Sequence, residues 1–205
     1  MMINRIGMKA ALTALLVMMS VSAGYTENKV HVVLGWKYNF GLYEHEYGGN
    51  ITRGDAKMYG NALHLTLLYD VLPQLSVGAG IGSDRYENPG YNTFPAFVTA
   101  QFHPMMNKLP KGYIFTNLGA GIHSDDADAF KGFMGDLGVG YTLMFHKHFG
   151  LDFQLGYDLK EFKGVPVYEM KVVNVEGNIT EVEINQIGCK NFWRHSIQMS
   201  VGLVF

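Results

Sequence analysis

The chain has 205 residues, of which 48% are hydrophobic and 17% are charged, so it forms one domain or at most two. Its formal net charge is −2 and it contains no block of basic residues, which argues against nucleic acid as a partner. Cys189 is the single cysteine, so the composition excludes an internal disulfide and a cysteine-ligated zinc cluster.

The first 23 residues have the pattern of a secretory signal peptide. Arg5 and Lys9 form a positive start, residues 10–19 form an apolar segment too short to span a bilayer, and small residues ending at Ala23 resemble a cleavage site. A buried amphipathic helix is the alternative, but the segment is apolar all round. We therefore expect residues 24–205 to form the mature domain. Removing the two cations leaves 14 basic against 18 acidic residues, a net charge of −4.

Alternation of apolar with small or polar residues predicts a series of β-strands. In the first of them, Trp36, Tyr38 and Phe40 alternate with Lys37 and Asn39, which places the two sets on opposite faces. That strand has about the 9 to 11 residues that a tilted transmembrane strand needs. The eight predicted strands are residues 32–42, 62–69, 75–82, 94–102, 114–122, 136–143, 151–159 and 196–205.

The predicted connections alternate in length, so the long ones are expected at one end of the sheet. The long connections are residues 43–57, 83–92, 123–132 and the stretch of about thirty residues before the last strand. The shorter connections are residues 70–74, 103–112 and 146–150.

Side-chain size indicates which face points inward. A barrel of about eight strands has an interior just wide enough for side chains, and the aromatic face would overfill it, whereas the glycine-rich face leaves room for polar groups. The predicted outward aromatic residues are Trp36, Tyr38, Phe40, Tyr69, Phe102, Tyr141, Phe153 and Tyr157. The predicted inward residues, which we expect to pair and to plug the barrel, are Lys37, His64, Gln101, Asp136, Asp152, Gln154, Asp158 and Arg194.

An apolar belt around a whole barrel exceeds the few hundred Å² that soluble monomers usually expose, so lipid is its expected solvent. In hydrocarbon every backbone group needs a partner, and a closed ring of strands provides one. The last strand, ending at Phe205, is therefore expected to pair with the first. The sequence predicts an all-β fold, an eight-stranded antiparallel up-and-down transmembrane β-barrel.

Two segments resemble the small outer-membrane β-barrel domain proteins of Gram-negative bacteria, similar to OmpX and the barrel of OmpA. They are "GDLGVGYTLMFHKHFGLDFQLGYDL" (residues 135–159) and "HSIQMSVGLVF" (residues 195–205). The resemblance covers the mature chain and implies export to the outer membrane, contact with its lipid and lipopolysaccharide, and a terminal Phe205 that the barrel-assembly machinery reads. It implies no catalytic residue and no cofactor.

Two clusters contain residue types found in catalytic or metal sites. His123 and Ser124 lie beside aspartates 125, 126 and 128, near where barrel-type lipid A deacylases carry their catalytic groups, but adjacent residues on a strand face opposite sides. The aspartates lack the ligand spacing of a strong calcium site. His146 and His148 flank a tight turn without further metal ligands, and His64 is expected to be a hydrogen-bonded interior residue.

The connection before the last strand contains two β-rich runs around a turn at residues 176–178. We expect the last two strands to continue past the membrane as a hairpin over residues 165–187, whose exposed edge can recruit an extracellular protein partner; the alternative is a protruding loop without a partner. The sequence thus favours a non-enzymatic barrel with a structural or surface-interaction role. A lipid A-modifying enzyme is the second hypothesis.

Overall fold

The computed structural model describes residues 29–46, 49–87, 90–105, 108–122, 130–146, 149–175 and 179–205. All regular secondary structure in these ranges is β-strand. None of the described segments forms a helix long and apolar enough to cross a membrane. The strands are β1 (Val30–Glu46), β2 (Gly49–Thr52), β3 (Tyr59–Leu72), β4 (Leu75–Glu87), β5 (Tyr91–Phe102), β6 (Gly112–Ile122), β7 (Gly132–His146), β8 (Phe149–Val175) and β9 (Ile179–Val204).

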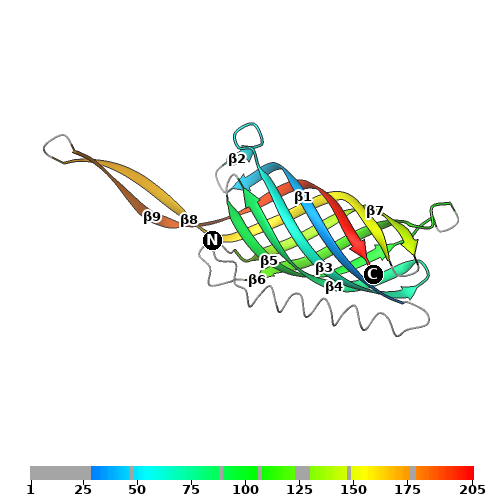
Figure 1. Cartoon of the computed structure of the whole chain (residues 1–205). Helices are drawn as coiled ribbons and strands as arrows, with labels where there is room; N and C mark the ends of the chain where they lie inside the picture. The colour runs from blue at the N-terminus through cyan, green and yellow to red at the C-terminus, as the bar shows by residue number, and fades with distance from the viewer. Residues whose placement is uncertain are drawn as a thin grey trace.

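The strands form one antiparallel sheet that closes on itself (Figure 1). Its order is β2-β1-β3-β4-β5-β6-β7-β8-β9, and β1 also pairs with β9. The sheet has nine strands in the described ranges, one more than predicted, because β2 pairs with the far end of β1 and lies outside the ring. Without β2, eight strands make the ring, which confirms the predicted up-and-down barrel.

The first and last strands join along most of their length. Their register runs from Val33↔Val204 to Glu46↔Phe192, with one irregularity after Gly41. Beyond this register the Phe205 N–H donates to the Val32 carbonyl at 2.9 Å, and the Val32 N–H donates to the Phe205 carbonyl at 3.0 Å. The expected pairing of the last strand with the first is confirmed.

Two predicted connections contain strands. Within residues 43–57, β1 continues to Glu46 and β2 spans Gly49–Thr52. Residues 83–92 were expected to be a long loop, but β4 continues to Glu87 and β5 begins at Tyr91, with Asp84 opposite Thr93. The reason is that β4 and β5 continue beyond the apolar belt, where outward residues no longer need to be apolar and the alternation fades. The strand cores themselves lie where the sequence predicted them.

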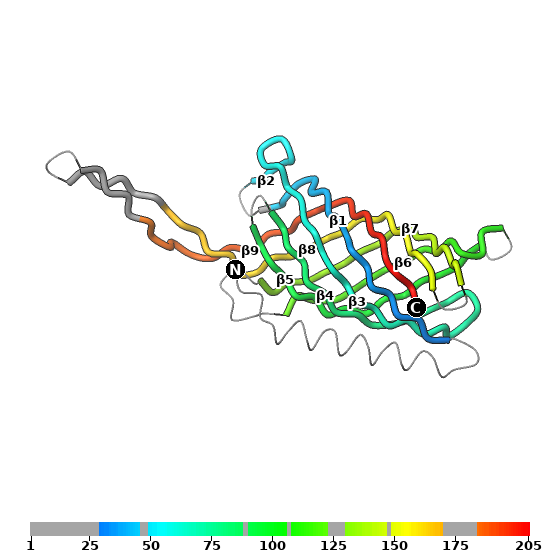
Figure 2. The backbone as a smooth tube through the Cα atoms, viewed as in Figure 1, coloured from blue at the N-terminus to red at the C-terminus, as the bar shows by residue number. Residues whose placement is uncertain are grey.

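Beyond the ring, β8 and β9 continue as a two-stranded ribbon that projects away from the barrel (Figure 2). Their pairing extends to Val175↔Ile179, which confirms the predicted continuation as a hairpin; its turn at residues 176–178 lies outside the described residues. We call residues 165–187 the ribbon, and the end of the barrel that carries it the hairpin end. The opposite end carries the β3–β4, β5–β6 and β7–β8 connections, and we call it the short-turn end.

The two faces of the ring have the predicted orientation. Trp36 is 50% exposed on the outside and its neighbour Lys37 is 5% exposed inside. Tyr38 and Phe40, also predicted to be fully outward, are half-buried. The other six aromatic residues predicted to point outward are exposed, namely Trp36, Tyr69, Phe102, Tyr141, Phe153 and Tyr157.

Glycines make room for the large residues inside. A Cβ at Gly80 would overlap the Phe97 ring, and a Cβ at Gly140 would overlap the Tyr113 ring. Both rings are buried. Glycines on the inner face therefore allow a narrow barrel to hold aromatic as well as charged side chains.

Candidate functional site

The interior of the barrel holds buried charge clusters that join strands far apart in the chain. In the first, Lys37 on β1 donates from Nζ to Asp136 on β7 at 2.7 Å. Asn117 on β6 donates to the same carboxylate oxygen at 3.0 Å. Because the charges are buried and paired across the lumen, they fill it rather than line an open path.

The second cluster is centred on Asp84 of β4. Lys160 of β8 lies 2.6 Å from one carboxylate oxygen, and His64 Nε2 lies 2.6 Å from the other. The Thr93 hydroxyl donates to Asp84 at 3.2 Å. His64 is therefore a hydrogen-bonded interior residue, as predicted.

A third cluster lies nearer the hairpin end. The fully buried guanidinium of Arg194 on β9 forms an ion pair with Glu44 on β1. The guanidinium carbon of Arg194 lies 5.3 Å from the centroid of the Tyr86 ring and 5.8 Å from that of Phe162. These distances are within the range of cation–π attraction, so the arginine connects the ion pair to the aromatic residues beside it.

Aromatic residues fill the interior at the hairpin end. The rings of Phe162 and Phe192 stack with centroids 5.0 Å apart, and Tyr86 meets Phe162 edge to face at 5.3 Å. Together with the residues packed around them they form what we call the aromatic cap, consisting of Tyr86, Tyr91, Phe130, Phe162, Val165 and Phe192. The cap and the Arg194 pair obstruct this end of the barrel.

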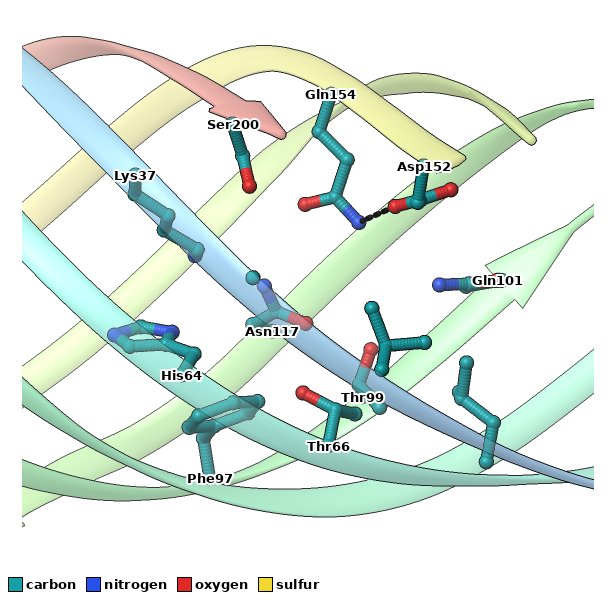
Figure 3. Close-up of a pocket in the computed structure, with 13 residues that line it drawn as sticks. Lys37, His64, Thr66, Phe97, Thr99, Gln101, Asn117, Asp152, Gln154 and Ser200 are labelled. Atoms are coloured by element: carbon teal, nitrogen blue, oxygen red, sulfur yellow. Dashed lines mark hydrogen bonds between the residues drawn. The ribbon is translucent and has the colours of Figure 1, made fainter. Parts of the chain in front are cut away.

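Two interior spaces lie between the middle of the barrel and the short-turn end. A polar cavity of about 30 Å³ lies in the middle of the barrel between Lys37, His64, Asn117 and Gln154 (Figure 3). A second space of about 260 Å³ follows, and both are lined by Gln101. The interior therefore opens toward the short-turn end and narrows toward the cap.

The polar groups at the short-turn end are bonded mainly to one another. Asp152 accepts hydrogen bonds from the Tyr113 hydroxyl at 2.6 Å and from the Thr142 hydroxyl at 2.9 Å. His31 lies 2.9 Å from Asp70, and the Ser76 hydroxyl donates to that same carboxylate. Because Asp70 stands between the serine and the histidine, these residues do not form a nucleophile–base pair.

Most of the catalytic and metal candidates from the sequence lie outside the described residues. His123, Ser124 and the aspartates 125, 126 and 128 lie outside the described residues, as does His148. His146 is exposed at the end of β7. No group of three or more His, Cys, Asp or Glu side chains in the described ranges could hold a metal ion.

Sequence reasoning missed the aromatic cap. Tyr86, Tyr91 and Phe130 fell in predicted connections, and Phe162 and Phe192 fell between predicted strands. Tyr86 and Tyr91, five residues apart in the sequence, were the available signal. Both tyrosines lie on strands, β4 and β5. Aromatic side chains that point inward at the end of a barrel can close it.

A closed ring of antiparallel strands with an apolar outside and a charge-paired inside defines a β-barrel of the outer-membrane class. No protein-family model and no curated protein matches the chain. Its fold is similar to the outer membrane protein OprG from Pseudomonas aeruginosa (13% identity, 86% of this chain and 94% of that chain, TM-score 0.44). It is also similar to the outer membrane protein AlkL (13%, 87% and 92%, TM-score 0.38) and to the outer membrane protease OmpT from Escherichia coli (13%, 89% and 98%, TM-score 0.29). The class itself follows from the strand pairing and the two faces.

Proposed function

We propose that the protein is a non-enzymatic integral barrel of the outer membrane of a Gram-negative bacterium, exported by residues 1–23 and surrounded by lipid and lipopolysaccharide. The observation that supports this most is the exposed apolar belt around a charge-paired interior, since such a belt needs hydrocarbon as solvent. The hairpin end would face outward, and β1 would begin and β9 end on the periplasmic side.

Electrophoresis tests the membrane location and the barrel together. A folded outer-membrane barrel resists detergent until it is heated, so unheated and heated samples of the membrane fraction should migrate differently. Recovery from the soluble fraction with one unfolded mobility would refute the proposal.

We further propose that the ribbon is the interaction element. Beyond the ring, β8 and β9 pair with each other, so each presents an outer edge to which a partner strand can add. Tyr168 and Ile187 on the ribbon are 56% and 62% exposed, well away from the belt. An extracellular protein that supplies a strand with apolar side chains fits this surface.

A shortened variant tests the role of the ribbon. Replacing residues 167–185 by an Asp-Gly turn should leave insertion and heat-modifiability unchanged, because the ring and its β1–β9 pairing are intact. Adhesion of whole cells carrying this variant to surfaces coated with extracellular proteins should fall to that of cells without the gene. Unchanged adhesion would refute the interaction role, and failure to insert would mean that the ribbon is part of the barrel proper.

The assembly role of Phe205 is a separate proposal. Its backbone bonds with Val32 do not depend on its side chain. Phe205→Ala should therefore fold into detergent in vitro almost as the parent does, while its level in the outer membrane of living cells falls. Equal levels in cells would contradict a role as a signal for the assembly machinery.

A lipid A deacylase remains the alternative function, and it rests on the sequence at His123 and Ser124. Mass spectrometry of lipid A from cells with and without the gene distinguishes the two. Loss of one acyl chain that depends on both residues would favour the enzyme, and unchanged lipid A would support the non-enzymatic barrel.

A further inference from the structure

An apolar groove of about 720 Å³ crosses the outer wall of the barrel over five neighbouring strands. Its walls are two rows of outward residues that face each other across strands. The first row consists of Leu109, Tyr141, Phe153, Val201 and Trp36. The second row consists of Ile114, Val139, Leu155 and Met199.

The register explains why a groove forms between these rows. The strand positions between them belong to Tyr113, Gly140, Gln154 and Ser200, which pair with one another and alternate toward the lumen. Their backbone therefore forms the floor of the groove. At its start Gly112 has no side chain, and Leu109 from the β5–β6 connection lies in the space that a Cβ there would occupy.

The groove has the dimensions of a lipid chain. Five strands span four spacings of ~4.8 Å, about 19 Å, which exceeds the ~15 Å of one hydrocarbon leaflet. Because strands of such barrels tilt by about 35–45°, a groove perpendicular to them runs obliquely into the membrane. It starts at the short-turn end, near Leu109, and reaches Trp36 farther along the barrel axis.

Lys108 directly precedes in sequence Leu109, which lines the start of the groove. Pro104, Met105 and Leu109 line it, and the Lys108 and Leu109 N–H groups both donate to the Met105 carbonyl, at 3.0 Å and 2.7 Å. Lys108 is exposed in this turn, next to the groove residue Leu109. A lysine beside an apolar groove at the membrane interface is suited to a phosphate group.

We propose that this groove is a binding site for an anionic phospholipid of the periplasmic leaflet, with one acyl chain between the two rows and the phosphate at Lys108. The inference rests on the proposed membrane location and adds a lipid class and a position to it. Continuity of the groove with the apolar belt, and the exposed Lys108 next in sequence to Leu109 at its start, support a phospholipid as the occupant.

Trp36 provides the readout, since the chain has two tryptophans and Trp193 is not among the residues that line the groove. The full chain with Trp193→Phe is reconstituted in phosphatidylcholine vesicles that contain increasing fractions of phosphatidylglycerol brominated on an acyl chain. We expect Trp36 fluorescence to be quenched at about two- to fivefold lower fractions than with brominated phosphatidylcholine.

Matched pairs of substitutions test whether the quenching of Trp36 depends on Lys108 and on the groove. Lys108→Gln should abolish the preference for the anionic lipid, whereas Lys29→Gln, which alters another exposed lysine at the same end, should retain it. Val139→Phe should narrow the groove and reduce quenching by both lipids. Val98→Phe, at an equally exposed outward position that is not among the groove residues, should not.

The outcomes separate this inference from the membrane proposal. Failure of the parent protein to float with vesicles would refute the membrane location. If the parent protein inserts and both lipids quench Trp36 equally, the lipid site is refuted and the barrel proposal stands. The same holds if Lys108→Gln and Lys29→Gln have the same effect on the preference for the anionic lipid. Lys108 lies in an exposed turn, so its variant remains informative even if Val139→Phe does not fold.

Discussion

At the residue scale, single glycines decide whether the interior can be packed. Gly140→Ala should lower the free energy of unfolding in lipid vesicles by about 1–3 kcal/mol, because the new methyl group overlaps the buried Tyr113 ring. The matched control is Gly49→Ala in β2, where an added Cβ meets no atom within 4 Å. Urea titration followed by fluorescence measures both, and equal midpoints would contradict the predicted overlap.

The buried ion pair at the hairpin end predicts strong coupling between its partners. Arg194→Ala leaves the Glu44 charge in a buried site and should destabilise the barrel by about 3–5 kcal/mol. Adding Glu44→Ala should restore part of that loss, because the buried Glu44 charge is then removed together with that of Arg194. A double-mutant cycle from urea unfolding gives the coupling, and additive losses would show that the two charges do not stabilise each other.

An exposed pair serves as the control for this cycle. Arg85 and Glu87 lie 3.5 Å apart, with most of the Arg85 side chain in solvent. Removing either should change stability little, because exposed charges are screened by water and salt. A large effect there would mean that position, rather than burial, determines the loss at Arg194.

At the scale of strands, the ribbon and the ring should differ in backbone protection. In the ring each strand pairs with a neighbour on both sides, whereas beyond Val165 β8 and β9 pair with each other along one edge. Amides of residues 167–187 should therefore exchange with solvent much faster than those of β4 or β6. Hydrogen exchange of the protein in lipid nanodiscs, read by mass spectrometry, measures this, and uniform protection would indicate that a partner or second copy covers the ribbon.

The strands also show what the sequence could and could not predict. Within the belt, the alternation at Trp36 and Lys37 indicates both the strand and the face on which each residue lies, because lipid favours apolar side chains outside and the narrow lumen favours small or polar ones inside. Beyond the belt, outward side chains do not have to be apolar. The ends of β4 and β5 and the aromatic cap were therefore not predicted, although inward side chains there, such as Asp84 and Tyr86, are as buried as those in the belt. The short strand β2, which is mostly exposed, was not predicted either.

The sequence predicts which residues point into the barrel, but not which of them pair there. The sequence placed Lys37 and Asp136 inside, but alternation carries no information on which inward residues meet across the lumen. That depends on the tilt and stagger of the ring, which bring β1 opposite β7. The same limit applies to Lys160, which was not among the predicted inward residues and contacts Asp84.

For the whole molecule, closure of the ring and filling of its interior predict a barrel without a through pore. The aromatic cap and the Glu44–Arg194 pair obstruct the hairpin end, while the space of about 260 Å³ lies at the other end. The parent protein in planar bilayers should therefore show no conductance above that of the lipid.

Removing the obstruction should open the barrel. A variant that combines Phe162→Ala, Phe192→Ala, Glu44→Ala and Arg194→Ala deletes two cap rings and both members of the buried ion pair, so neither of these two charges remains. We expect this variant to conduct, provided that heat-modified gel mobility shows it to be folded. The control is Phe102→Ala with Phe153→Ala, which deletes two rings from the outward face and should leave the bilayer as tight as the parent does. If the parent conducts as well as the cap variant, the cap does not close the barrel. If the folded cap variant does not conduct, the deeper clusters around Asp84 and Asp136 close it.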